Sequence, residues 1–115
     1  MKYTDLNALL VEVTKTDARH ISSKAFAVAG LSLKKLRDVL YKLGDIYYED
    51  LENKVYVAGI RGGFARMNLA TVALHLDGKK LYISVSAKYG LLKQSTKEEV
   101  INELKYSLEG YIIQE

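Results

Sequence analysis

The chain of 115 residues contains no cysteine and no proline, and it has only two histidines. Without cysteine it cannot form disulfides, zinc ribbons or a thiol nucleophile. The absence of proline is typical of a chain made of regular elements that are joined by Gly and Asn turns. The sequence has neither a signal peptide nor an apolar run long enough to span a membrane, so we expect a cytoplasmic protein without a membrane contact.

Catalytic and metal-binding signals are weak. We expect His20 in a loop and His75 on the polar face of a strand, and neither has the spacing of a metal site or a catalytic triad. The acidic residues are scattered or lie in the first turns of expected helices, where the helix dipole already explains them. We therefore expect a protein that is not an enzyme and has no catalytic residue, no metal and no cofactor.

The charge of the chain is only mildly basic. The formal net charge is +3, and 49% of the residues are hydrophobic, which is enough for a core. Residues 1–63 carry ten basic and eight acidic side chains, and residues 64–115 carry seven and six. Neither half is the strongly basic body of a non-specific nucleic-acid coat, so any contact with nucleic acid must be local.

A helix over residues 32–44 is the clearest expectation. Ser32 is a natural N-cap, and Gly44 is expected to end the helix in the left-handed conformation. The apolar residues recur at spacings of three and four and are Leu33, Leu36, Val39, Leu40 and Leu43. The opposite side of the helix is mostly basic and carries Lys34, Lys35, Arg37, Asp38, Tyr41 and Lys42.

Two further helices are expected before this one. Ser22 or Ser23 can cap a short helix over 22–29, and Gly30 then supplies the turn. Residues 5–15 carry a helical stripe of Leu6, Leu9, Leu10 and Val13. A strand over 9–14 is the alternative, but the helical spacing starts at Leu6 and favours the helix.

After Gly44 the apolar period changes to two, which predicts a hairpin of strands near 46–49 and 54–60. If Asp50 to Asn53 form its loop, Glu49 lies opposite Lys54 as a pair of opposite charges. One face of this hairpin would then carry Ile46, Tyr48, Val55 and Val57.

The order of helix, turn, helix and hairpin over residues 4–60 resembles the winged helix-turn-helix DNA-binding domains. The residues that carry the resemblance are Ala25, Ala29, Gly30, Leu31, Leu36 and Val39, whereas Phe26 stands where the family usually has Ala. The resemblance implies a homodimer on duplex DNA, with residues 32–43 as the recognition helix. The contacts that it implies are Lys34, Lys35, Arg37, Tyr41 and Lys42, with Arg61 and Arg66 as auxiliary phosphate contacts.

The second half is expected to form another hairpin and a helix. Strands near 69–76 and 79–87 flank Asp77-Gly78, a pair suited to a type I′ turn, which places Leu74 opposite Leu81. A helix near 96–112 would bury one stripe, which consists of Val100, Ile101, Leu104, Leu108 and Tyr111. Between the halves, Gly59, Gly62 and Gly63 with Arg61 and Arg66 form either a basic phosphate-contacting loop or a plain hinge.

We therefore expect an α+β fold in which an N-terminal three-helix, winged-helix-like unit leads into antiparallel hairpins and a C-terminal helix. Residues 1–63 and 64–115 form two units or one continuous domain. The expected function is binding of duplex DNA, as in a transcriptional regulator.

A protein-interaction module, such as an inhibitor, adaptor or assembly subunit, is the main alternative to DNA binding. At the expected hairpin tip, Glu49, Asp50 and Glu52 outnumber Lys54, and phosphates would repel them. A small-molecule sensor that uses the polar strand face of Thr71, Tyr82 and Ser84 is a third possibility. The nine tyrosines also permit base stacking, although aromatic residues favour strands in any case.

Overall fold

The computed structural model describes residues 3–15, 21–62, 68–87 and 93–113, which form three helices and five strands. The helices are α1 (Tyr3–Thr14), α2 (Leu33–Leu43) and α3 (Lys93–Ser107). The strands are β1 (Ile21–Ala27), β2 (Gly44–Asp50), β3 (Val55–Gly62), β4 (Asn68–Asp77) and β5 (Lys80–Ala87).

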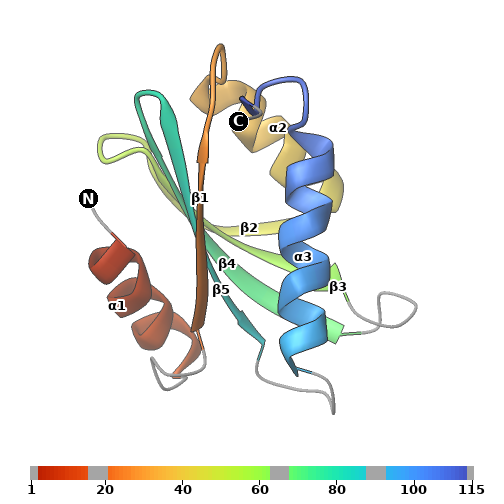
Figure 1. Ribbon diagram of the computed structural model, residues 1–115. Coiled ribbons are helices and arrows are strands. Elements are labelled where there is room, and N and C mark those ends of the chain that lie inside the picture. The colour runs from red at the N-terminus through yellow and green to blue at the C-terminus, as the bar shows by residue number, and fades with distance from the viewer. Residues whose placement is uncertain (1–2, 16–20, 63–67, 88–92, 114–115) are drawn as a thin grey trace.

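All five strands belong to one antiparallel sheet in the order β1-β5-β4-β3-β2. Figure 1 shows α1 on one face of this sheet and both α2 and α3 on the other. The face under α2 and α3 holds the larger core, to which β3, β4 and β5 contribute alternate side chains. Its strand residues include Tyr56, Ala58, Ile60, Ala70, Val72, Leu74, Leu76, Leu81, Ile83 and Val85.

The expected N-terminal three-helix unit is wrong, because residues 21–27 form strand β1 rather than a helix. β1 pairs with the outer edge of β5, where Phe26 lies opposite Leu81. Phe26 and Val28, two positions apart, both pack against the larger core. The bulky Phe26, which departed from the helix-turn-helix pattern, therefore has the alternate-residue spacing of a strand. The fold is α+β, but it has no helix pair at 22–44 and hence no winged helix.

Helix α2 is confirmed, and its N-terminal cap is the expected one. The Lys35 amide donates to the Ser32 hydroxyl at 3.2 Å, and Leu36 and Leu40 are fully buried against the sheet. Gly44 plays a different role from the one expected, because it is extended, with φ −179°, and begins β2. A Cβ at Gly44 would collide with the Gly59 carbonyl oxygen, so glycine is needed there for close approach of the backbones.

The β2–β3 hairpin exists, but its register differs from the expected one. Glu49 lies opposite Tyr56, not Lys54, and the pairing shifts between Ile46 and Tyr48 because Tyr47 forms a β-bulge. The bulge turns Ile46 toward the larger core, whereas Tyr48 lies opposite Val57 on the other face. The expected common face of Ile46 and Tyr48 is therefore wrong, since an inserted residue reverses the alternation beyond it.

The β4–β5 hairpin has its loop one residue later than expected. Asp77 pairs with Lys80, so the loop is Gly78-Lys79, and Gly78 has φ 58°, as the first position of a type II′ turn requires. Leu74 consequently lies opposite Ile83 rather than Leu81. The residue opposite Leu74 thus shifts by two positions along β5. Because side chains on a strand alternate with a period of two, the expected apolar face of the hairpin is retained.

The helices on the two faces bury different strand positions. Helix α1 is confirmed; its Leu6 and Leu10 pack on Val55, Val57 and Ala73 in a second, smaller core. On the other face, the expected stripe of α3 is buried at Val100, Ile101, Leu104 and Leu108. The helix ends at Ser107, and the chain then turns so that Ile112 bridges to Val28.

Leu36→Ala should lower the free energy of unfolding by about 2–5 kcal/mol, because truncation leaves a cavity between α2 and the sheet. The exposed control Lys34→Ala, on the outer side of the same helix, should cost less than about 0.5 kcal/mol. Urea denaturation followed by circular dichroism measures both values. Similar losses for the two variants would show that the buried side of α2 is wrongly assigned.

Candidate functional site

The residues that the sequence suggested for DNA contact fall into two groups. Lys34, Lys35, Arg37, Tyr41 and Lys42 all lie exposed on the outward side of α2. Arg61 lies on β3, next to the inward-facing Ile60, so it projects from the opposite face of the sheet, where α1 lies. Arg66 lies outside the described residues. The structure thus separates Arg61 from the α2 side chains that it was expected to assist.

Arg37 is engaged within the protein. Its Nε lies 3.0 Å from Glu49 Oε1 on β2, and its guanidinium carbon lies 5.3 Å from the centroid of the Tyr41 ring. Its Nη2 also donates to the Tyr41 hydroxyl at 3.3 Å. The hydrogen bond with Tyr41 and the charge of Glu49 raise the pKa of Arg37 above its ordinary value. The pair is well exposed, so it adds little stability, but it joins the outward face of α2 to strand β2.

Residues 33–54, which span α2, β2 and the hairpin loop, carry as many acidic as basic side chains. Between residues 33 and 54 the basic residues are Lys34, Lys35, Arg37, Lys42 and Lys54, and the acidic residues are Asp38, Asp45, Glu49, Asp50 and Glu52. This region therefore has no net charge. A protein gains most of its non-specific affinity for duplex DNA from an excess of positive charge on its own surface. The equal numbers of basic and acidic residues here therefore do not favour phosphate binding.

The bulge in β2 places two adjacent tyrosines on the face of the sheet that α1 also covers. Tyr48 lies opposite Val57, and the hydroxyl end of Tyr47 lies over Gly59, where an added Cβ would collide with it. The side chain of Tyr47 is nevertheless 52% exposed and that of Tyr48 is 43% exposed, because α1 packs mainly on β4 and β5. A regular strand would have pointed one of these rings to the other face.

Four large exposed side chains flank β2, with Tyr41 on the α2 side of the sheet and Tyr47 and Tyr48 on the α1 side. Tyr41 lies on α2, Tyr47 and Tyr48 on β2, and Leu51 in the hairpin loop, with exposed fractions of 55%, 52%, 43% and 59%. We name this set the β2 surface. Tyrosine is enriched in protein interfaces because its ring covers a large area and its hydroxyl tolerates water. The sequence permits base stacking by its tyrosines, but Tyr56 is buried on the opposite face, so the described tyrosines of β2 and β3 form no continuous stacking platform.

The polar side of β4 and β5 is largely buried instead of solvated. Ser84 is fully buried and donates to Asn7 Oδ1 on α1 at 2.7 Å. His75 is 5% exposed, so its expected surface position is wrong; it stacks on Tyr82, and its Nδ1 lies 3.3 Å from the Lys54 carbonyl oxygen. Among the described residues, no cluster of three or more His, Asp or Glu side chains could hold a metal ion.

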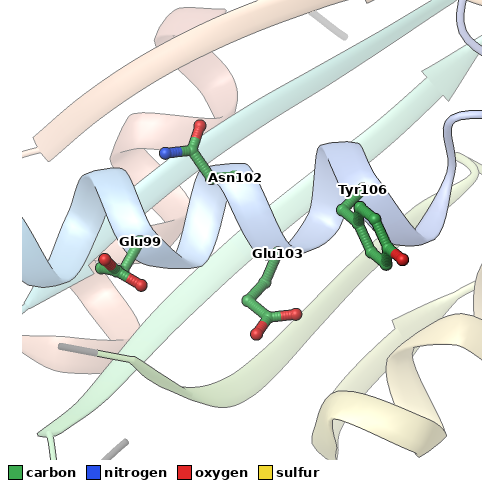
Figure 2. A pocket seen from close by; sticks show the side chains of 4 residues that line it. All are labelled: Glu99, Asn102, Glu103 and Tyr106. Carbon is green, nitrogen blue, oxygen red and sulfur yellow. The ribbon is translucent and has the colours of Figure 1, made fainter. Parts of the chain in front are cut away.

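Helix α3 carries an open recess of about 310 Å³ on its outer side. Its described lining consists of Glu99, Asn102, Glu103 and Tyr106, and Figure 2 shows Asn102 pointing away from Glu103 and Tyr106. Spacings of four and three residues place Glu99, Glu103 and Tyr106 in one row along the helix. All four described residues come from a single helix, so the described part of the lining lacks the converging groups of a ligand pocket.

No protein-family model matches the chain, and neither does any curated protein sequence. No helix in the described part of the chain combines the length and apolar character needed to cross a membrane. The adjacent tyrosines of residues 47–48 were the available sequence signal for the β2 surface, because two neighbouring aromatic residues interrupt strict alternation.

Asp50 shapes the hairpin loop beside the β2 surface. Its Oδ1 accepts from the Asn53 amide at 3.1 Å, and its Oδ2 accepts from the Asn53 side chain at 2.8 Å. These hydrogen bonds favour the carboxylate, the side-chain bond most strongly, and hold the pKa of Asp50 below its ordinary value of 3.8. The contribution of these hydrogen bonds to the stability of the folded protein is present above the pKa that Asp50 has in the unfolded chain. It is lost as the pH falls through the lower pKa that Asp50 has in the folded protein.

Asn53→Ala should raise the pKa of Asp50 toward 3.8, because it removes the stronger of the two hydrogen bonds. A carbon-detected NMR titration of the side-chain carboxyl measures this shift. Asn102→Ala on α3, far along the chain, is the matched control and should leave the Asp50 titration unchanged. Equal titration curves in wild type and Asn53→Ala would contradict the loop structure.

Proposed function

We propose that the protein is a protein-interaction module that contacts its partner through the β2 surface. The observation that carries this proposal is that Tyr41, Tyr47, Tyr48 and Leu51, all more than two-fifths exposed, flank one edge strand on its two sides. A few aromatic anchors of this kind supply most of the binding energy in protein interfaces. The protein would act as an adaptor, inhibitor or assembly subunit.

The electrostatics around β2 also favour a protein partner. The region of residues 33–54 has equal numbers of basic and acidic side chains, and Arg37 is paired with Glu49. Charges of both signs at the rim of an interface guide a protein partner and fix its orientation. The backbone of a DNA duplex carries only negative charge, and its phosphates would repel Glu49, Asp50 and Glu52.

Site-specific photocrosslinking tests the proposal. The photoreactive amino acid p-benzoylphenylalanine replaces Tyr48 in one variant and Tyr106 in another, and both are irradiated in the source cells. Tyr106 is the control because it is 74% exposed but lies on α3. We expect a discrete protein adduct from position 48, absent at position 106, whose yield falls about tenfold when Tyr41→Ser is added.

Three results of this experiment would count against the proposal. Equal adducts at positions 48 and 106 would mean that exposure rather than a defined surface determines the labelling. An adduct at position 106 alone would move the contact to α3. The absence of any protein adduct at position 48 would overturn the interaction module.

Duplex DNA is the second candidate ligand, because Lys34, Lys35 and Lys42 project from the exposed side of α2. If they contact phosphates, changing all three to Gln should lower the duplex affinity at least about tenfold at low salt. The salt dependence should also flatten by roughly 0.9 per lost contact. Fluorescence anisotropy at two salt concentrations measures both effects, and no binding by the wild type at about 50 mM salt would remove this candidate.

A further inference from the structure

Strand β2 is the open edge of the sheet on the side away from β1. It pairs only with β3 in the described part of the chain, and it is seven residues long, or about 23 Å. In an antiparallel pair, alternate residues direct their N–H and C=O groups away from the neighbouring strand. The outer side of β2 thus offers backbone groups with which another extended chain can pair.

The opposite edge of the sheet is covered in part by the protein itself. The Ala29 amide donates to the Tyr111 carbonyl oxygen, and the Ile113 amide donates to the Ala27 carbonyl oxygen, each at 2.8 Å. The C-terminal segment thereby pairs with the end of β1, where Val28 bridges to Ile112. No described segment pairs in this way along the outer side of β2, so β2 is available to a partner over its whole length, whereas β1 is covered at one end.

The two faces beside β2 differ in chemistry. Asp45, opposite Gly59, and Asp50, opposite Val55, share the α1 side of the sheet with Tyr47 and Tyr48. Carboxylates interleaved with exposed tyrosine rings suit Lys or Arg side chains, which pair with the former and lie over the latter. On the α2 side, Glu49 is already held by Arg37, next to the Tyr41 ring and the half-buried Ile46.

A second copy of the same strand fits this edge poorly. If two β2 strands paired antiparallel about Asp45 or about Glu49, that carboxylate would face itself in the other copy. Like charges directly opposite each other destabilise a strand pair. The charge pattern therefore favours a partner strand of the opposite sign.

We propose that the β2 edge binds an extended segment of another protein by strand addition, and that this segment alternates basic with apolar side chains. The basic side chains would lie on the α1 side, against Asp45, Asp50 and the tyrosines. The apolar side chains would lie on the α2 side, near Ile46 and Tyr41. This assignment rests on the proposed interaction module, for which it names the partner chemistry and the binding mode.

A synthetic peptide tests the assignment. The probe is acetyl-KVKVKVK-amide, and the matched control EVEVEVE reverses its charge without changing its alternation. Amide NMR spectra and hydrogen exchange of the intact chain report where each peptide binds. We expect the basic peptide to shift the amide signals of residues 44–50 and to protect outward-facing β2 amides from exchange, whereas the acidic peptide does neither.

Two changes test the backbone and the charge parts of the assignment separately. N-methylation of alternate peptide amides removes backbone donors along one side, so one of the two alternating patterns should weaken binding about tenfold or more and the other much less. Changing Asp45 and Asp50 of the protein to Asn should weaken binding of the basic peptide. Glu98→Gln on α3 is the control and should leave this binding unchanged. Equal effects of the two methylation patterns would overturn strand addition.

Failure of this assignment can be distinguished from failure of the interaction module. If the basic peptide does not bind, or shifts β1 or α3 instead of β2, strand addition by a basic segment is wrong. A protein adduct at position 48 would still support the module in that case. An adduct composed of two copies of this chain would also overturn the proposal of a basic partner, since it would show that the protein binds a second copy of itself at this edge.

Discussion

Alternate apolar side chains of β3, β4 and β5 form one continuous face, and burial of this face is what positions both α2 and α3. Helix α2 contributes Leu36 and Leu40, and α3 contributes Val100 and Leu104, all fully buried against the sheet. Their burial removes a large apolar area from water, which is the main favourable term in folding. Because the apolar stripe of α2 is buried against the sheet, its charged side faces outward beside β2. This orientation creates the α2 part of the candidate surface.

The β-bulge at Tyr47 determines the chemistry of that surface. Beyond the bulge the alternation of β2 is reversed, so Glu49 faces α2 and can pair with Arg37, while Tyr48 joins Tyr47 on the other side. Gly59 allows the Tyr47 ring to lie across the neighbouring strand. Bulges commonly occur at sheet edges and redirect side chains there. Here the bulge gives the edge an aromatic, acidic side and a neutral side.

The two edge strands of the sheet, β1 and β2, differ in how far they are paired and in their charge. The C-terminal segment pairs with the end of β1, whereas no described segment pairs with the outer side of β2, which carries acidic residues along its length. Charged residues and bulges on an edge strand discourage pairing with identical strands. The same features permit pairing with a strand of opposite charge, so protection from self-association and selectivity for a basic partner have one physical origin.

The sequence by itself determined the helices whose apolar residues repeat over several turns. Ser32 and the spacing of Leu36 and Leu40 predicted α2, and the apolar face of the β4–β5 hairpin was also predictable, because these patterns are local. Tertiary structure alone decided that residues 21–27 form a strand, since this short segment has no helical stripe and the free edge of β5 supplies its hydrogen bonds. It also decided the bulge at Tyr47 and hence the candidate site, because strand register depends on which backbone groups meet across the sheet.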